Sequence, residues 1–461
     1  MGDLLTNFLA ARATFGGTLM FHIIFASLGV VMPFMMLVSQ WLYLRRGDRV
    51  YLALNKKWTS AFAVTYAIGA VSGTVLTFGF GLLWPNFMNV AGPVMGYPLA
   101  IEVLFFLVEA IFLGIYVFGR DQLSPWLHWI SGLPIFIGGF MSMIVVVLAN
   151  SWMNTPAGFT LNGAGEVVSI DLVRAMFSPA WFYEASHMTI AAFEAVAFAF
   201  AAVYAVGMLR GRRDAYHRRG LMISMIVATI ATPVMIISGD LTAKGVAHEE
   251  PAKLAAMEPQ FETERGAPLS IGGYPDVEAG EVKYDLEIPY MISILAFDDP
   301  NAPVQGLDDF PADERPDPRA VWWAFDAMVG IGFALVAVVA GFWLAYWRGR
   351  GVPTNKLVLG SVGLSGFLGF LAIELGWITT ELGRQPWVIK GVMRTAEGVT
   401  PAPGIGYALV GFMSLYVVLA TICIRLLLNM ATGAPPELEE QEGGEPGSPQ
   451  EERETLREGS L

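Results

Sequence analysis

Long apolar segments alternate with polar connections along most of this 461-residue chain. Several of the apolar runs exceed the roughly 18 residues that indicate a helix crossing a membrane. The pattern therefore predicts an all-α, polytopic integral membrane protein. We expect nine transmembrane helices, at about 14–44, 57–83, 97–119, 127–150, 181–208, 219–239, 320–347, 357–380 and 404–430.

Two hydrophilic segments stand apart from these spans. Residues 240–319 separate the sixth and seventh spans and are rich in Pro, Gly and acids, with ordered-looking pieces at 252–257 and 288–297. Residues 433–461 are rich in Glu, Gly and Pro, and we expect them to be disordered. The chain thus divides into six spans (1–239), a long loop (240–319), three spans (320–432) and an acidic tail.

The distribution of Lys and Arg predicts the orientation of the chain, because cytoplasmic loops carry the excess of positive charge. The basic residues gather after the odd-numbered spans, so the N-terminus and the long loop are expected outside, and the C-terminus inside. Residues 1–12 lack the features of a cleaved signal peptide, so the first span is expected to be retained. The basic loop residues are Arg45, Arg46, Arg49, Lys56, Lys57, Arg210, Arg212, Arg213, Arg218, Arg219, Arg348, Arg350 and Lys356.

Composition agrees with a membrane body and excludes several function classes. The chain is 54% hydrophobic and 15% charged, and its net charge is −13. Residues 240–319 contribute −12 and the tail −7, which leaves +6 on the spans and short loops, with no basic face for nucleic acid. Cys423 is the only cysteine, which excludes disulfides, thiolate metal clusters and covalent haem attachment.

A layer of polar side chains is predicted inside the membrane. Counting about 1.5 Å per residue from the span ends places His22, His187, Met328 and Glu374 roughly 9–13 Å below the outer surface, each in a different span. Glu102 joins the same layer. Such residues are costly in hydrocarbon, and each is a candidate for function.

The types of side chain in this layer suit haem iron. An imidazole and a thioether, from His187 and Met328, can together hold a six-coordinate, low-spin haem that transfers electrons. His22 and Glu374 would each be the lone protein ligand of a further haem, which leaves one iron position open for oxygen.

Other interpretations of the same residues stay open. Met328 alone could be core packing, and a lone intramembrane His could carry protons. Glu102, Glu374 and Glu109, which lies two turns deeper than Glu102, could form the proton wire of a cofactor-free, proton-coupled transporter. That alternative leaves the matching depth of His and Met unexplained. With five histidines in total, the patterns of haem–copper oxidases and of two-haem cytochromes b are excluded.

Four short motifs carry a family resemblance. They are Glu-Leu-Gly-Arg-Gln-Pro-Trp at 381–387, Gly-Tyr-Pro-Leu-Ala-Ile-Glu at 96–102, Ala-Asn-Ser-Trp-Met-Asn at 149–154 and Lys-Leu-Ala-Ala-Met-Glu at 253–258. With these motifs the chain resembles subunit I of the cytochrome bd-type quinol oxidases, over nearly its whole length from His22 through the ninth span.

The resemblance implies three haems near the outer face. His187 and Met328 match the ligands of a low-spin haem b. His22 and Glu374 match those of a high-spin haem b and a haem d, or a second high-spin b-type haem, and which residue serves which haem stays open. Further cofactor-binding positions implied by the resemblance are Arg12, which could instead be a snorkelling terminal charge, Trp377 and Arg384.

The resemblance also implies the substrates and the proton path. Lys253 and Glu258 match quinol-binding residues, and without the match they would be solvated loop charges. Glu102, Glu109, Ser142 and Asn150 match a proton path from the inside, with helix-packing hydrogen bonds as the alternative for the last two.

The activity implied is oxidation of quinol at the outer face and reduction of O2 to water, which builds a proton-motive force without pumping. A haem-bearing oxidase with a non-quinol donor is the alternative. The implied partners are a second large membrane subunit, a small one-span subunit and membrane lipid, in a bacterial or archaeal cytoplasmic membrane.

Two departures from better-known relatives concern the low-spin haem. Glu184 and Asp326, three and two residues before its ligands, stand where those relatives carry Lys and Arg. Ionised carboxylates there would lower the potential of this haem.

Overall fold

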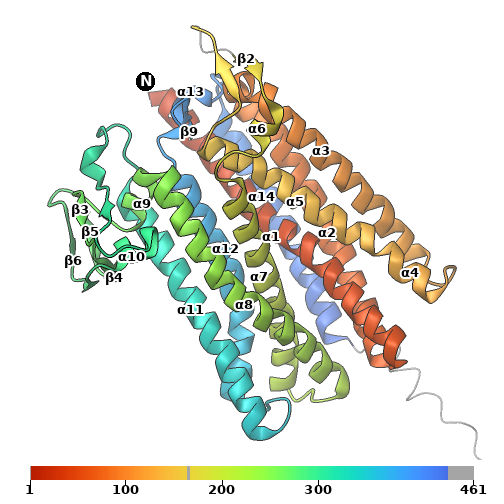
Figure 1. Cartoon of the computed structure of the whole chain (residues 1–461). Helices are drawn as coiled ribbons and strands as arrows, with labels where there is room; N and C mark the ends of the chain where they lie inside the picture. Colours follow the sequence, from red (N-terminus) through yellow and green to blue (C-terminus); the bar gives the residue numbers. More distant parts are fainter. Residues whose placement is uncertain (1, 164–166, 434–461) are drawn as a thin grey trace, which may run out of the picture.

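A computed structural model describes residues 2–163 and 167–433, in which nine helices are long and apolar enough to cross a membrane. They pack side by side as one elongated bundle (Figure 1). Eight of these spans are single helices, namely α1, α2, α3, α7, α8, α11, α12 and α14. The fourth span combines α4 with α5. Their bounds are α1 Gly2–Arg46, α2 Arg49–Leu83, α3 Pro85–Phe118, α4 Pro125–Ser131, α5 Leu133–Asn154, α7 Trp181–Leu209, α8 Ala215–Glu249, α11 Pro318–Gly349, α12 Lys356–Gly383 and α14 Ile405–Thr432.

Local sequence explains where several of these helices begin. The side chains of Asp48, Asp214, Asp317 and Asn355 each accept a hydrogen bond from a backbone N–H in the first turn of α2, α8, α11 and α12. Such capping satisfies N–H groups that have no partner within the helix. α3, α4 and α11 begin with a proline in the first turn, where its missing N–H costs nothing.

The predicted spans are all present, but four helices extend well beyond them. α1 begins at Gly2 rather than 14. α2 begins at Arg49 rather than 57, α3 begins at Pro85 rather than 97, and α8 continues to Glu249 rather than 239. The first ten residues of the predicted loop are therefore helical. The fourth span breaks at Gly132 into α4 and α5. The predicted disordered tail, apart from Gly433, lies outside the described residues.

The two ends of the bundle differ. One end, here called the loop end, carries the N-terminus, the hairpin β1–β2 with α6, the long loop between α8 and α11, and the segment between α12 and α14 (Figure 1). The opposite end carries short turns and most of the basic residues. The smaller elements outside the long loop are β1 Phe159–Leu161, β2 Val167–Ile170, α6 Leu172–Met176, β9 Trp387–Ile389, β10 Met393–Arg394 and α13 Thr395–Gly398.

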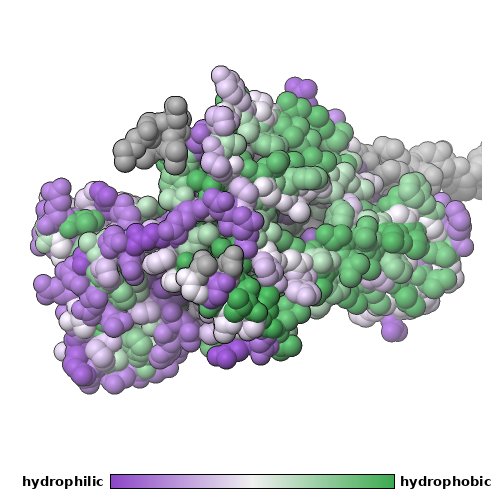
Figure 2. Space-filling model, turned by 90° about the horizontal axis from the view of Figure 1, so that it is seen from above, coloured by the Kyte–Doolittle hydropathy of each residue, from purple (hydrophilic) through white to green (hydrophobic). Residues whose placement is uncertain are grey.

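The long loop is folded. Its strands pair as the antiparallel sets β3–β8, β4–β7 and β5–β6, and its two helices match the predicted ordered pieces. A small core of its own, including Leu254, Phe261 and Ile292, packs on Tyr183 of α7 and Val321 of α11. Seen from the loop end, this region is largely hydrophilic beside the apolar bundle (Figure 2). The elements are α9 Pro251–Met257, β3 Glu264–Arg265, β4 Leu269–Ile271, β5 Tyr274–Asp276, β6 Glu281–Lys283, β7 Leu286–Ile288, α10 Met291–Phe297, β8 Pro303–Val304 and the 3-10 helix η1 Leu307–Asp309.

Small residues let α7 approach α12 closely. A Cβ added to Gly369 of α12 would lie 2.7 Å from Cα of Ala195, and one added to Gly366 would lie 2.7 Å from Cβ of Ala202. Small residues allow such backbone contact between membrane helices. The two antiparallel helices are thereby fixed in one register, which pairs position 369 with 195 and, by counting, position 377 with 187.

Candidate functional site

The imidazole of His22 is held between α1 and α2 in a defined tautomer. Its Nδ1 lies 2.9 Å from Oγ of Ser72, and that hydroxyl lies 3.1 Å from the carbonyls of Ile68 and Gly69. A carbonyl only accepts, so the hydroxyl proton is directed to the helix and Nδ1–H of His22 donates to Ser72. Nε2 then carries a free lone pair, as a metal ligand requires. Gly73 lies against the ring, and a Cβ there would be 2.9 Å from Cε1.

His187 of α7 is arranged in the same way against α8. Its Nδ1 lies 3.1 Å from Oγ of Ser238, whose hydroxyl lies 3.0 Å from the carbonyl of Met235. The ring also hydrogen-bonds the backbone of Ser238. Nδ1–H is again the donor, which leaves the lone pair of Nε2 available for iron.

The two remaining candidate ligands, Met328 and Glu374, both lie at α12. A Cβ added to Gly376 would lie 3.1 Å from Sδ of Met328, so the thioether rests against α12. Glu374 is two residues away on the same helix, and its Oε2 is buried without a hydrogen bond to any residue that the structure describes. A buried carboxylate oxygen without a partner is costly, and a metal cation would satisfy it.

Helix registers place these groups in one layer. Gly29 of α1 approaches Glu109 of α3, so His22 and Glu102, each seven residues earlier on parallel helices, lie at one depth. Ile23 and Ile373, neighbours of His22 and Glu374, share one apolar cluster. The α7–α12 register sets His187 opposite position 377, one turn from the contact between Gly376 and Met328. The layer is thus about one helical turn, or 5 Å, deep.

The residues present fit haem better than a bare ion. Among the described residues, no three His, Cys, Asp or Glu side chains gather as a metal-binding group. The layer instead contains two imidazoles with free Nε2 atoms, one thioether, and one carboxylate whose Oε2 has no hydrogen-bonding partner among the described residues. A macrocycle that supplies four iron ligands needs one or two more from the protein, which is what this layer offers.

Two of the other predicted cofactor residues lie near this layer or above it. Trp377 packs against the cluster of Ile23, Ala195 and Ile373, between α1, α7 and α12. Arg12 lies ten residues, or about 15 Å, nearer the loop end than His22 on α1. Its guanidinium carbon is 5.4 Å from the ring centroid of Phe8.

Arg384 belongs to a buried polar network at the loop end. Its guanidinium bonds Oε2 of Glu381 at 2.5 Å and Oδ1 of Asn154 at 3.0 Å. Asn154 donates to Oε1 of Glu184 at 2.6 Å, and Asn150 donates to Oε1 of Glu381 at 2.8 Å. Nε of Arg384 is buried and makes no hydrogen bond within the described residues, so one donor remains for a ligand. The network joins α5, α7 and α12.

The predicted quinol residues lie on the short helix α9 of the long loop. Lys253 is 3% exposed and forms an ion pair at 2.5 Å with Glu250, which is fully buried. The chain packs tightly there, since a Cβ on Gly383 would lie 2.7 Å from Cγ of Lys253. Glu258 ends α9. Burial, and then the negative charge of Asp326, raise the pKa of Glu258 to about 8. A carboxyl with this pKa is suited to exchange protons near neutral pH.

The predicted proton residues fall into two groups. Ser142 of α5 donates to Oε1 of Glu102 at 3.0 Å. Glu109 lies two turns deeper on α3, and its buried Oε1 has no hydrogen-bonding partner within the described part of the chain. Tyr66 of α2 stands beside this pair, and its hydroxyl donates to the carbonyl of Phe106 at 3.2 Å. Asn150 does not join them, because it faces Glu381 on α12. The structure therefore groups Ser142 with Glu102 and sets Asn150 in the network of Glu381 and Arg384.

Several polar residues of this region were given no role from the sequence. Glu250 forms the ion pair of Lys253, but nothing in its local sequence distinguishes it from a loop charge. Glu381 and Asn154, which hold Arg384, lie within two of the quoted motifs, but those motifs do not reveal this contact. Glu194, buried in α7, did carry a signal, because it is an acid in the middle of an apolar run.

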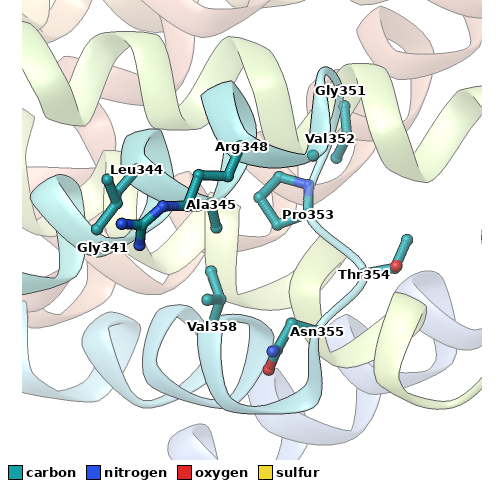
Figure 3. A pocket seen from close by; sticks show the side chains of 11 residues that line it. Gly341, Leu344, Ala345, Arg348, Gly351, Val352, Pro353, Thr354, Asn355 and Val358 are labelled. Atoms are coloured by element: carbon teal, nitrogen blue, oxygen red, sulfur yellow. The ribbon is translucent and has the colours of Figure 1, made fainter.

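Two cavities lie at opposite ends of the molecule. The larger, about 480 Å³, opens at the turn between α11 and α12, lined by Arg348 and residues 351–355 (Figure 3). It lies at the opposite end from the candidate ligands and is no part of their site. A smaller hollow of about 190 Å³ lies at the loop end beside Asn154, Glu249 and Lys390. Burial lowers the pKa of this lysine.

Comparison with known proteins shows the family of this chain. Residues 10–435 match the family described as cytochrome bd terminal oxidase subunit I. The chain belongs to that family. The solved structure of a bd oxidase from Geobacillus thermodenitrificans is similar, with TM-score 0.87 and 40% identity over 92% of this chain and 98% of the other.

Two Bacillus subtilis (strain 168) proteins are also similar. One, provisionally named cytochrome bd menaquinol oxidase subunit I, is 36% identical over 92% of this chain and 96% of its own length. The other, cytochrome bd ubiquinol oxidase subunit 1, is 30% identical over 92% and 93%. The predicted family and fold class are thereby confirmed: this bd oxidase subunit is a multi-pass membrane protein of a haem-dependent respiratory oxidoreductase family.

Proposed function

We propose that this chain is the haem-bearing subunit of a quinol:oxygen oxidoreductase. The observation that carries the proposal is the layer of His22, His187, Met328 and Glu374, in which both imidazoles keep a free Nε2 and Glu374 keeps an unpartnered oxygen. His187 and Met328 would hold a low-spin haem b, and His22 and Glu374 the two haems of the oxygen site, a high-spin haem b and a haem d or second b-type haem. When bound, the haems carry electrons from quinol to oxygen and supply the iron at which oxygen becomes water.

The protein supplies quinol chemistry at the loop end. Glu258, with its raised pKa, accepts a quinol proton, and the ammonium of Lys253 donates a hydrogen bond to a quinone oxygen. Arg384, with a free Nε above the layer, offers charge to a haem propionate, as does Arg12. The positive residues at the opposite end support an orientation with the loop end outside.

Protons for oxygen reduction come from the other side of the membrane. Glu109 and Glu102, with Ser142 and Tyr66 beside them, form a polar line on α3 that rises toward the layer of His22. Quinol protons released outside and oxygen-bound protons taken from inside build a proton-motive force without pumping. A second large membrane subunit, a small one-span subunit and a bacterial or archaeal cytoplasmic membrane complete the proposal.

Haem ligation is tested by spectra of ligand variants of the purified complex. His187→Ala or Met328→Leu removes the low-spin haem spectrum while the oxygen-binding haem persists. Met35→Leu, at a fully buried methionine of the core, is the matched control and keeps every haem. A full low-spin spectrum in both ligand variants would overturn the ligand assignment.

The electron donor is tested separately. Glu258→Ala abolishes quinol oxidation with haem content unchanged, whereas Glu287→Ala, an exposed acid in β7 of the same loop, leaves turnover as in the wild type. Unchanged turnover in Glu258→Ala, with oxygen consumption supported by another donor, would refute quinol oxidation at α9.

A further inference from the structure

Glu194 is a buried acid that the proposed function does not use. It lies near the middle of α7, is 6% exposed, and hydrogen-bonds the hydroxyl of Thr232 on α8. None of the ion pairs among the described residues includes it. α8 has no ionisable side chain between Arg219 and Asp240, so no cation faces Glu194 from that helix.

Thr232 joins Glu194 to the backbone of α8. The hydroxyl of Thr232 lies 2.8 Å from the carbonyl of Ala228, one turn earlier on α8. A hydroxyl has one proton, so it can serve either the carbonyl of Ala228 or the carboxyl group of Glu194, but not both at once. A carboxyl group in hydrocarbon with no charge partner is expected to be neutral.

The position of Glu194 couples it to the candidate low-spin haem. His187 faces Ser238, Glu194 faces Thr232, and Gly207 faces His217, so one constant register runs along the seam between α7 and α8. Glu194 lies seven residues, or about 10 Å, below His187 on this seam. The ionisable groups of the helices around this seam that are nearest to Glu194 in height are His22 of α1, Asp326 of α11, Glu374 of α12 and, deeper on α7, Tyr204. Arg12, Glu184, Lys356 and Glu381 lie nearer the ends of these helices.

We propose that Glu194 is a redox-linked proton site of the low-spin haem. It releases its proton when the iron beside His187 is ferric, and binds one again when that iron is ferrous. The step is balanced: one electron arrives at the iron, one proton forms the O–H bond of the carboxyl, and both leave on oxidation. The inference rests on the proposed function.

The physical reason is electrostatic. A ferric haem carries one net positive charge on its iron and ring, which favours an ionised carboxylate nearby in a medium of low dielectric constant. Reduction removes this charge, and the carboxylate binds a proton and returns to its neutral form. Electron entry into the membrane is thereby accompanied by a compensating proton.

The experiment is a redox titration of the low-spin haem in the complete oxidase at several pH values. In the wild type the midpoint potential falls as the pH rises through the titration range of Glu194, by up to one proton per electron. In Glu194→Gln it is independent of pH over that range. The reduced-minus-oxidised infrared spectrum of the wild type contains a protonated-carboxyl band that Glu194→Gln lacks. Ser224→Ala, at a buried polar residue elsewhere on α8, is the matched control and behaves as the wild type.

Failure of this inference can be distinguished from failure of the proposed function. If Glu194→Gln keeps the pH dependence of the wild type, or if the wild type shows neither the dependence nor the band, the inference is wrong. If Glu194→Gln does not assemble, Thr232→Val decides: it keeps the carboxyl, removes its partner and must shift the titration range, and an unshifted range overturns the inference. A wild-type complex without any low-spin haem contradicts the proposed function itself.

Discussion

The ion pair between Lys253 and Glu250 makes a quantitative prediction about the quinol helix α9. Both side chains are buried, and their charged atoms are 2.5 Å apart. Apart from this ion pair, neither carboxylate oxygen of Glu250 has a hydrogen-bonding partner among the described residues. Replacing Lys253 by Met keeps the volume and leaves a bare carboxylate inside the protein. We therefore expect Lys253→Met to loosen α9 as well as to weaken quinol binding.

The size of the effect follows from the burial of the pair. Removing one partner of a buried ion pair costs about 3–5 kcal/mol, because the remaining charge stays desolvated. The charge of Lys390 also reaches Glu250, so the lower part of this range is expected. If this cost lowers the free energy of local opening of α9 by the same amount, the backbone amides of α9 exchange with solvent roughly 100-fold faster or more.

Hydrogen exchange of residues 251–257, measured by mass spectrometry on the intact complex, checks this expectation. The control is Lys283→Met, since Lys283 pairs with Asp276 at 2.5 Å but is 41% exposed. Exposed pairs contribute about 0–1 kcal/mol, so exchange in β5 and β6 changes little. The double variant Glu250→Gln/Lys253→Met removes both charges and restores the protection of α9. Wild-type exchange in Lys253→Met would refute the ion pair and the reasoning built on it.

Four further outcomes are expected. Gly73→Ala places a Cβ 2.9 Å from the ring of His22, so a haem of the oxygen site is lost while the low-spin spectrum stays, as a pyridine-haemochrome assay would register. Gly376→Ala crowds Sδ of Met328 at 3.1 Å and shifts or removes the low-spin spectrum instead. Loss of the low-spin haem in Gly73→Ala, or of a haem of the oxygen site in Gly376→Ala, would contradict the ligand scheme. Because the pKa of Glu258 is about 8, its carboxylate form gains population as the pH rises through 8, so kcat/KM for quinol increases there and Glu258→Gln loses the increase. The same raised pKa stabilises the folded loop below the ordinary pKa of 4.5, and this contribution is lost progressively as the pH rises from there to about 8, which thermal unfolding at several pH values measures.

The sequence predicted the spans well because apolar runs of sufficient length have few alternatives to a membrane helix. It failed at helix ends for a physical reason. Polarity marks the limit of the hydrocarbon, whereas a helix continues until its backbone hydrogen bonds stop. α8 therefore runs through Asp240 and Lys244 to Glu249, and α3 begins at Pro85 despite Pro93 and Pro98.

The depth of the candidate ligands was predictable for a similar reason. A helix is a rod of constant rise, so counting residues from a span end gives height without knowledge of packing. The direction in which a side chain points around the helix axis is harder to predict. Glu102 and Glu109 are seven residues apart and point about 20° from each other, but Ser142 and Asn150 are eight apart and differ by about 80°. That difference turns Ser142 toward α3 and Asn150 toward α12.

What distinguishes ligand from structural histidine is visible only in the fold. Nε2 of His128 donates to the carbonyl of Tyr116 at 2.8 Å, and its Nδ1 lies 2.7 Å from the side-chain amide of Gln40, so both nitrogens are occupied. His22 and His187 each commit Nδ1 to a serine whose own proton is directed to a helix carbonyl. In each case one serine, supplied by a neighbouring helix about fifty residues away, leaves the ring nitrogen on the other side free for iron. Local sequence carries no sign of that pairing, which is why depth alone had to suggest the ligands.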